Sequence, residues 1–238
     1  MTDVRFAIVT DGHWGGQISD WEQKHDETLA NIESVHSNQP IDFLVHDGDL
    51  VDGSGEVDDV DQAHQEVITN FLSELPFNEY YAVQGNHDSN HSQTGSYWED
   101  TFGHPKDHTF TKSGYGFYVV DPQGSGWDTP PASHVESVLD DLSHTDGVFV
   151  FQHVAPFDDT DWAGDDNPDL REQYARDDVL AVFLGHEHNK NFRESREDPT
   201  GQRYYYCSRG AAADHNDDSS FEDIDELGFR LVEVSAIE

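Results

Sequence analysis

The stretch "YYAVQGNHDSN", residues 80–90, decides how the rest of the chain is interpreted. An apolar run from Tyr80 to Val83 is followed closely by a glycine, an amide, an imidazole and a carboxylate. Taken alone, this is a strand that ends in a polar turn, because Gly and Asn tolerate positive φ and Asp suits a turn or a helix cap. The stretch gains meaning if other strands of the chain end in the same way.

Four further apolar runs resemble this one. They are short, rich in Val, Ile, Phe and Leu, and bounded by turn residues, which is typical of strands buried on both faces. They occupy residues 5–11, 41–49, 147–153 and 179–188. Two more runs are predicted to be strands of a second sheet, and a last strand closes the chain: residues 115–121, 203–209 and 228–234.

Helical patterns lie between these strands. Apolar residues recur at three- and four-residue steps in residues 20–37, 58–75 and 132–142. Alternation of strand and helix predicts an α/β fold with a largely parallel central sheet, in a single domain over residues 1–238. Five histidines are predicted on helix surfaces and are assigned no role: His25, His36, His64, His134 and His144.

Each of the five buried strands ends in side chains that can bind a metal ion. In chain order these are Asp11, His13, Asp49, Asn86, His153, His186 and His188. The carboxyl ends of parallel strands share one edge of a sheet, so we expect these side chains to converge there. Glycines at 48, 85 and 185 are expected to let the backbone turn tightly beneath them.

The chemistry of this set favours a two-metal site. Imidazoles combined with carboxylate and amide oxygens suit Mn, Fe, Zn, Co or Ni, whereas the lack of cysteines argues against a structural zinc site. Seven ligands are too many for one ion that keeps an open position. They suit two ions that share a carboxylate, as in two-metal hydrolases.

The five motifs together resemble the calcineurin-like metallophosphoesterases. The family pattern is Asp-x-His, Gly-Asp, Gly-Asn-His-Asp or -Glu, a lone His, and Gly-His-x-His, and all five blocks occur here in order between residues 5 and 189. The resemblance implies a four-layer α/β/β/α sandwich of two mixed sheets. It also implies a hydrolase in which a hydroxide between two ions attacks phosphorus.

The resemblance assigns the site residues to roles. Asp11, His13 and His188 would bind one ion, Asn86, His153 and His186 would bind the other, and Asp49 would bridge them. His87 would face the leaving oxygen as an acid, and Asp88 would orient its imidazole.

The sequence around these motifs also bears on the branch of the family. "GDLVDGSG" and "GNHD", without a cap domain, look like the class III cyclic-nucleotide and glycerophosphodiester phosphodiesterases. Leu50, Val51 and Asp52 follow Gly-Asp where purple acid phosphatases carry a Tyr ligand. We therefore expect a small phosphorylated substrate, with a diester favoured over a monoester and Mn²⁺ favoured as the metal.

Two alternatives remain. A nuclease would need a positive groove, and the candidates for it are a few arginines after the last metal motif: Arg193, Arg196, Arg203 and Arg209. A non-catalytic scaffold is the second alternative. Such relatives lose ligands or the acid histidine, whereas this chain keeps all of them.

The net charge of the chain indicates the solvent and the partners to which the protein is suited. A net charge of -38 over 238 residues is spread along the whole sequence, including the acidic stretches 157–169 and 214–226, which are expected to be surface loops. Such self-repulsion is relieved by molar salt, which predicts a halophilic source. The charge disfavours nucleic acid and anionic membranes as partners. With no long apolar run and no signal-like start, we expect a cytoplasmic protein without a membrane helix, and the single cysteine excludes an internal disulfide.

Overall fold

The computed structural model describes residues 4–15, 21–53, 59–89, 97–122, 128–156, 167–186, 195–197, 203–206 and 229–234. One sheet has the order β10-β1-β2-β3. Its strands are β1 (Val4–Val9), β2 (Phe43–Asp47), β3 (Tyr80–Val83) and β10 (Arg230–Val234). The first three are parallel, and β10 pairs antiparallel with β1.

The second sheet has the order β4-β5-β6-β7-β9-β8. Its strands are β4 (His108–Lys112), β5 (Tyr115–Val119), β6 (Val148–Gln152), β7 (Val179–Leu184), β8 (Ser195–Glu197) and β9 (Arg203–Tyr206). The middle strands β5, β6, β7 and β9 are parallel, whereas β4 and β8 are antiparallel edge strands.

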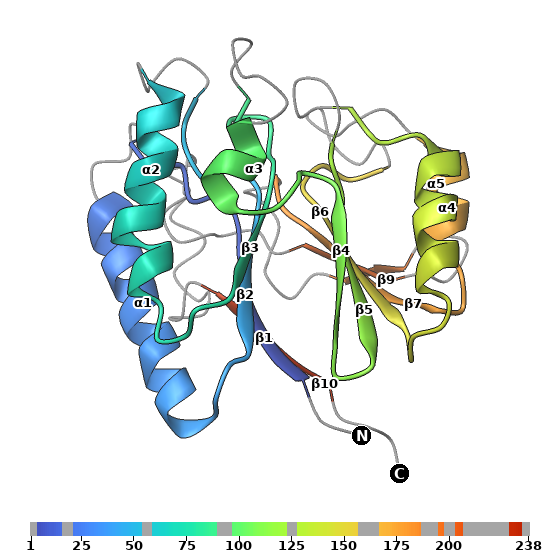
Figure 1. The fold of residues 1–238 in the computed structure, drawn as a ribbon, viewed down its shortest axis with the longest axis horizontal. Helices are drawn as coiled ribbons and strands as arrows, with labels where there is room; N and C mark the ends of the chain where they lie inside the picture. The colour runs from blue at the N-terminus through green and yellow to red at the C-terminus, as the bar shows by residue number, and fades with distance from the viewer. Residues whose placement is uncertain are drawn as a thin grey trace.

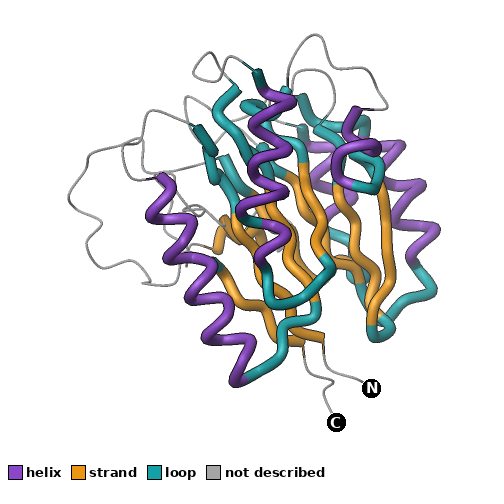
Figure 2. The backbone as a smooth tube through the Cα atoms, turned by 60° about the vertical axis from the view of Figure 1, so that its left-hand side comes forward, coloured by secondary structure: helices purple, strands orange, loops and turns teal. Residues whose placement is uncertain are grey.

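Helices cover the outer face of each sheet, as Figures 1 and 2 show. The helices are α1 (Trp21–Asn38), α2 (Val60–Asn70), α3 (Tyr97–Phe102), α4 (Ala132–Leu142) and α5 (Pro168–Tyr174), with a 3₁₀ turn η1 (Leu72–Glu74) after α2. The first three pack on the four-stranded sheet, and α4 and α5 pack on the other. The four-layer sandwich with two mixed sheets is therefore confirmed.

Phenylalanines fill the space between the two sheets. The ring of Phe6 in β1 stacks on Phe43 in β2 at a centroid distance of 5.0 Å and meets Phe117 of β5 edge-on at 5.6 Å. Phe149, Phe151 and Phe183 extend the same cluster. Large aromatic side chains bury much apolar area per residue, which explains how a chain with few aliphatic residues builds a core.

The assignment of strands to sheets differs from the prediction. The strands predicted within 115–121 and 203–209 lie in the same sheet as β6 and β7, and β1, β2 and β3 form the other sheet. The five ligand-bearing strands thus divide three and two. All of these strands are apolar on both faces, so their sequences carry no signal that distinguishes the sheets.

Hydrogen bonds nevertheless join the carboxyl ends of the strands across both sheets. His153, after β6, lies with its Nδ1 2.7 Å from the carbonyl oxygen of Asp47 in β2. Gly185, after β7, donates its N–H to the carbonyl of His153 at 3.0 Å. Residues predicted at one sheet edge therefore converge at the junction of two sheets.

Two of the histidines predicted on helix surfaces are buried. His25 of α1 and His64 of α2 are 2% and 0% exposed. The acidic stretch 214–226 lies outside the described residues, as does 157–166, whereas α5 already begins at Pro168. Within the described part of the chain, none of the helices has the length and apolar character needed to cross a membrane.

Candidate metal centre

The backbone at the strand ends adopts a conformation that side chains rarely tolerate. Five described residues other than glycine have positive φ: Asp11 (51°), His13 (43°), Asp49 (50°), Ser113 (54°) and His186 (69°). All of them except Ser113 are predicted ligands. Such strain persists where the surrounding structure enforces it, and it clusters at functional sites.

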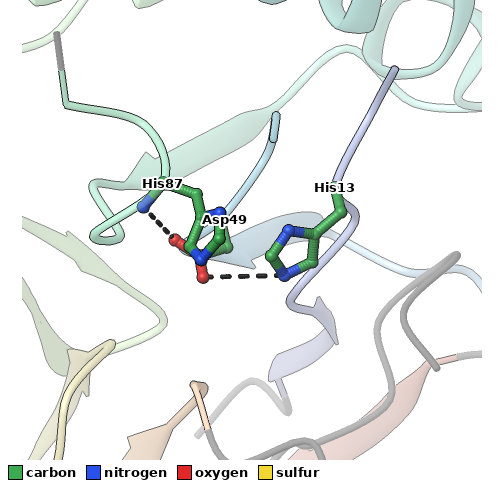
Figure 3. Close-up of side chains that lie close together, drawn as sticks. All are labelled: His13, Asp49 and His87. Atoms are coloured by element: carbon green, nitrogen blue, oxygen red, sulfur yellow. Dashed lines mark hydrogen bonds and ion pairs between the residues drawn. The ribbon is translucent and has the colours of Figure 1, made fainter. Parts of the chain in front are cut away.

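Asp49 lies at the centre of the site. Its Oδ1 accepts the backbone N–H of His87 at 2.8 Å, and its Oδ2 lies 3.6 Å from Nε2 of His13 and 3.2 Å from Nε2 of His153. Figure 3 shows the first two contacts. The imidazoles outweigh the effect of burial, which acts in the opposite direction, and hold the pKa of Asp49 well below 3.8.

Two groups of side chains with the spacing of metal ligands share this carboxylate. One group is His13, Asp49 and His87, and the other is Asp49, His153 and His186, with the ligand atoms of each within 4.8 Å of one another. His13 and His153 thus belong to different groups, and both approach the same oxygen, Oδ2, of a common carboxylate. A shared Asp49 agrees with two bridged ions, whereas the first group contains His87, which is predicted to be the acid and not a ligand.

The remaining predicted ligands are placed as follows. Asp11 is fully buried, and its carboxylate accepts the N–H of His186 at 3.1 Å and the hydroxyl of Thr10 at 2.8 Å. Asn86 lies beside His87 and is 8% exposed. His188 lies outside the described residues.

Several buried atoms of this site fit a cation. Among the described residues, Asn86 Oδ1 is buried without a hydrogen-bond partner, and the buried atoms Asp49 Oδ2 and His153 Nε2 face one another at 3.2 Å. His153 donates its Nδ1 proton to the Asp47 carbonyl, so a neutral imidazole directs the Nε2 lone pair at Asp49 Oδ2. Two electron-rich atoms 3.2 Å apart require a proton or a cation between them.

In the absence of an ion the proton takes that place. Burial lowers the pKa of His153, but the charge of Asp49 and its hydrogen bond outweigh burial and raise the pKa to about 10. A divalent ion in the same position would replace this proton. The donor set of imidazole, carboxylate and amide therefore fits the predicted transition-metal ions.

Glycines provide the room for this arrangement in two different ways. A Cβ at Gly48, where φ is 91°, would lie 2.2 Å from Nδ1 of His153, so both conformation and space require glycine. A Cβ at Gly85 would lie 2.2 Å from Asp49 Oδ1, although its φ is not positive. The predicted tight turn thus holds for Gly48, whereas Gly85 serves close approach.

The carboxylate that contacts the His87 imidazole is Asp52. Its Oδ1 lies 2.8 Å from Nδ1 of His87. This corrects the prediction for Asp88, which is fully buried and accepts the N–H groups of Gly85 at 2.8 Å and Val51 at 3.1 Å. Asp88 directly follows His87, whereas Asp52 lies 35 residues earlier in the chain, so the contact with Asp52 depends on the fold and is not evident from the sequence.

The surroundings of His87 favour its protonated form. Burial lowers the pKa of this imidazole, but the hydrogen bond to Asp52 and the charges of Asp49, Asp52 and Asp88 outweigh burial and raise it above 6.5. The side chain is 23% exposed, more than Asp49 or His153. His87 can therefore hold a proton where solvent or a substrate can reach it.

The fold and this arrangement define a two-metal phosphoesterase type of site. The chain belongs to the calcineurin-like phosphoesterase family, whose model matches residues 4–190. No curated protein matches the chain in sequence.

Solved structures with the same fold include proteins of different roles. A dimetal phosphatase from Danio rerio has a TM-score of 0.61 and 12% identity, over 86% of this chain and 87% of that one. GAP50, the anchor in the inner membrane complex of Plasmodium, has a TM-score of 0.55 and 18% identity, over 99% and 82%. A putative 5'-nucleotidase from Staphylococcus aureus has a TM-score of 0.56 and 13% identity, over 87% and 49%. At these identities the likeness shows the fold alone.

Proposed function

We propose that this protein is a dinuclear metal-dependent phosphoesterase that hydrolyses a small phosphodiester. The observation that carries the proposal is the Asp49 carboxylate, which is shared by two ligand groups and flanked by His13 and His153. Family membership independently supports phosphoric ester hydrolysis by metal ions. When bound, the ions would supply positive charge to the phosphoryl oxygens and activate a water molecule.

The ligands divide between the two ions as the motifs predict. Asp11, His13 and His188 would hold one ion, Asn86, His153 and His186 would hold the other, and Asp49 would contribute to both. Thr10 and the His186 N–H hold the Asp11 carboxylate in place, and the Asp47 carbonyl fixes the tautomer of His153. Mn²⁺ is the proposed metal, within a donor set that also suits Fe, Zn, Co or Ni.

His87 acts as the general acid. Asp52 accepts the hydrogen bond of Nδ1, so the second proton of the imidazolium resides on Nε2. Transfer of this proton to the leaving oxygen avoids the release of an alkoxide. Before the transfer, Asp52 stabilises the protonated form of His87. Asp88 holds the turn that carries His87.

The acidic composition supports a halophilic, cytoplasmic setting for this activity. Within the described part of the chain, Arg5, Lys112 and Arg176 pair with nearby carboxylates. Cations bound in this way do not form a groove for a nucleic acid backbone. The side chains of Arg193, Arg196, Arg203 and Arg209, the candidates for a nuclease groove, lie outside the described part of the structure. The preference for a small substrate over a nucleic acid therefore rests on the net charge of -38.

Hydrolysis of an aryl phosphodiester and of the matching monoester tests the proposal. The protein is stripped of metal and assayed with and without Mn²⁺ in molar KCl. We expect turnover that requires metal and that is faster for the diester. Faster turnover of the monoester would contradict the diester proposal and leave a phosphatase.

A scaffold role is the alternative of a different class, because GAP50 shares the fold and is an anchor. The retained ligands and acid argue against it here. Two bound ions per chain without turnover of either ester would favour the scaffold.

A further inference from the structure

A buried hydrogen-bond chain outside the predicted ligands leads to the acid-bearing turn. His64 of α2 is fully buried, with Nε2 3.2 Å from Oδ1 of Asp88 and Nδ1 3.2 Å from the hydroxyl of Tyr97. Its ring packs edge-on against Trp98 and Phe102 of α3, at centroid distances of 5.8 and 5.4 Å. His64 therefore joins α2, α3 and the turn after β3.

The chemistry of the partners fixes the direction of this chain. A carboxylate only accepts hydrogen bonds, so Nε2 of His64 donates to Asp88, and Nδ1 is left for the contact with the hydroxyl of Tyr97. Burial raises the pKa of Tyr97 to about 12, which keeps its hydroxyl protonated. That hydroxyl also lies 3.4 Å from the carbonyl of Asp61, a second and longer contact.

Asp88 connects His64 to the backbone of the candidate metal site. One of its oxygens accepts the N–H of Gly85, which closes the turn carrying Asn86 and His87. The other accepts the N–H of Val51, in the loop that carries Asp49 and Asp52. The Asp88 carboxylate is fully buried, so each lost donor leaves its charge less compensated.

We propose that His64 is a positioning residue, which acts through Asp88 to hold Asn86 and His87 against the Asp49 loop. This inference rests on the proposed function and extends it to a histidine that contacts neither metal nor substrate. His64 contacts Asp88, which precedes residues 90–96, and Tyr97 of α3, which follows them. Metal affinity and proton transfer would then both depend on a side chain beneath the site.

Four variants test this role in the full-length protein in molar KCl. His64→Leu fills the volume without donor or acceptor, whereas His64→Gln offers an amide donor to Asp88 and a carbonyl acceptor to Tyr97. Tyr97→Phe removes only the outer hydroxyl. His36→Leu is the matched control, because His36 is a hydrogen-bonded histidine of α1 that contacts Ile41 before β2, away from the site.

The expected result separates positioning from folding. His64→Leu should lower kcat by roughly 10–100-fold and weaken Mn²⁺ binding by about tenfold, with KM changed by less than about threefold. His64→Gln should recover most of both losses, Tyr97→Phe should lower kcat by roughly 2–10-fold, and His36→Leu should leave both unchanged. Nitrogen-15 spectra of labelled histidine should show a proton on Nε2 of His64.

Three results would overturn the inference. They are wild-type kcat and Mn²⁺ affinity in folded His64→Leu, no recovery in His64→Gln, or an Nδ1–H tautomer at His64. If His64→Leu does not fold, an unchanged kcat in Tyr97→Phe overturns it instead. If the wild-type protein hydrolyses neither ester, the proposed function fails, and equal Mn²⁺ affinity of the wild type and Tyr97→Phe would then reject the positioning role separately.

Discussion

Two carboxylates beside His87 act on it in different ways. Asp52 contacts the imidazole directly at 2.8 Å, whereas Asp88 accepts hydrogen bonds from the backbone of Gly85 and Val51. Asp52 therefore raises the pKa of His87 through a direct hydrogen bond, whereas Asp88 positions the backbone turn that carries the residue. The two roles are separable by substitutions that remove charge but keep shape.

Replacement Asp52→Asn should move the basic limb of the kcat profile to lower pH. The contact with Asp52 raises the pKa of His87, and an acid must be protonated to act, so activity is lost as pH rises through this pKa. An amide keeps the hydrogen bond but not the charge, so the pKa of His87 should fall and the basic limb should shift to lower pH. The rate of diester hydrolysis from pH 5 to 10 measures this shift.

The remote carboxylate Asp140, which pairs with Arg176 on the surface, provides the control. Asp140→Asn should leave the profile unchanged. An unmoved basic limb in Asp52→Asn would show that another group carries the proton.

Replacement Gly85→Ala should abolish tight metal binding without unfolding the protein. A Cβ at this position would lie 2.2 Å from Oδ1 and 2.3 Å from the backbone N of Asp49, so the bridging carboxylate must move. We expect fewer than two tightly bound ions per chain, measured by elemental analysis after gel filtration.

Gly103→Ala is the contrasting control. Gly103 has a φ of 78° but no atom within 4 Å of the added Cβ, so this change strains the backbone without touching the site. It should lower stability by about 1–2 kcal/mol and leave metal content at the wild-type value. Equal metal content in both variants would remove the packing argument for Gly85.

Residue spacing explains which site features could be predicted. The convergence of the candidate ligands in the two groups around Asp49 could be predicted, because each follows a strand and carries a donor atom. His64 was missed, although it falls between Val60 and Val67 on the apolar stripe of α2, and His25 likewise precedes Leu29 at a four-residue step. Helical periodicity, when histidine is counted with the apolar residues, therefore predicts that His25 and His64 are buried.

At the scale of elements, β2 carries a buried histidine that hydrogen bonds do not compensate. His46 is fully buried, its ring approaches Phe71 at 6.5 Å, and among the described residues neither of its ring nitrogens has a hydrogen-bond partner. Burial first, and then the neighbouring His25, lower the pKa of His46 to about 3. The unfolded chain takes up a proton near pH 6.5, whereas the folded protein does not, so stability falls as pH drops from about 6.5 to about 3.

Replacement His46→Leu should therefore reduce the acid sensitivity of the protein. The variant should gain stability relative to the wild type as pH falls below 6.5, by up to about 1.4 kcal/mol for each pH unit. Urea unfolding at pH 7.5 and 5 in constant KCl measures the gain, with the exposed His144→Leu as control. Parallel pH dependences in His46→Leu and wild type would mean that other groups cause the acid sensitivity.

The division of strands between sheets was the element-scale feature that the sequence did not contain. Phe43 and Val45 of β2 face the other sheet, whereas Leu44 packs against the helices, yet all three are equally apolar. Pairing is decided by contacts between strands far apart in the chain, such as β7 with β9. Local patterns identify such strands but do not determine their neighbours.

At the scale of the whole molecule, the repulsion between its negative charges depends on the salt concentration of the solvent. The net charge is -38, from 50 acidic and 12 basic residues, so pairing with Lys and Arg leaves most carboxylates uncompensated. At 0.1 M salt the Debye length is about 10 Å and charges on one face repel, whereas at 1 M it is about 3 Å. Repulsion acts on the compact state more strongly than on the extended chain, because folding brings the charges together.

Thermal unfolding should therefore occur at higher temperature in concentrated salt. Between 0.1 and 2 M KCl we expect the midpoint to rise by roughly 10 °C, which is about 3–4 kcal/mol for a chain of this length. Circular dichroism of the metal-loaded protein measures the midpoint, and sucrose at matched osmolality provides the control, because it favours compact states without screening charge. A flat dependence on KCl would mean that the acidic surface does not limit stability, and an equal rise in sucrose would assign the effect to hydration rather than to charge.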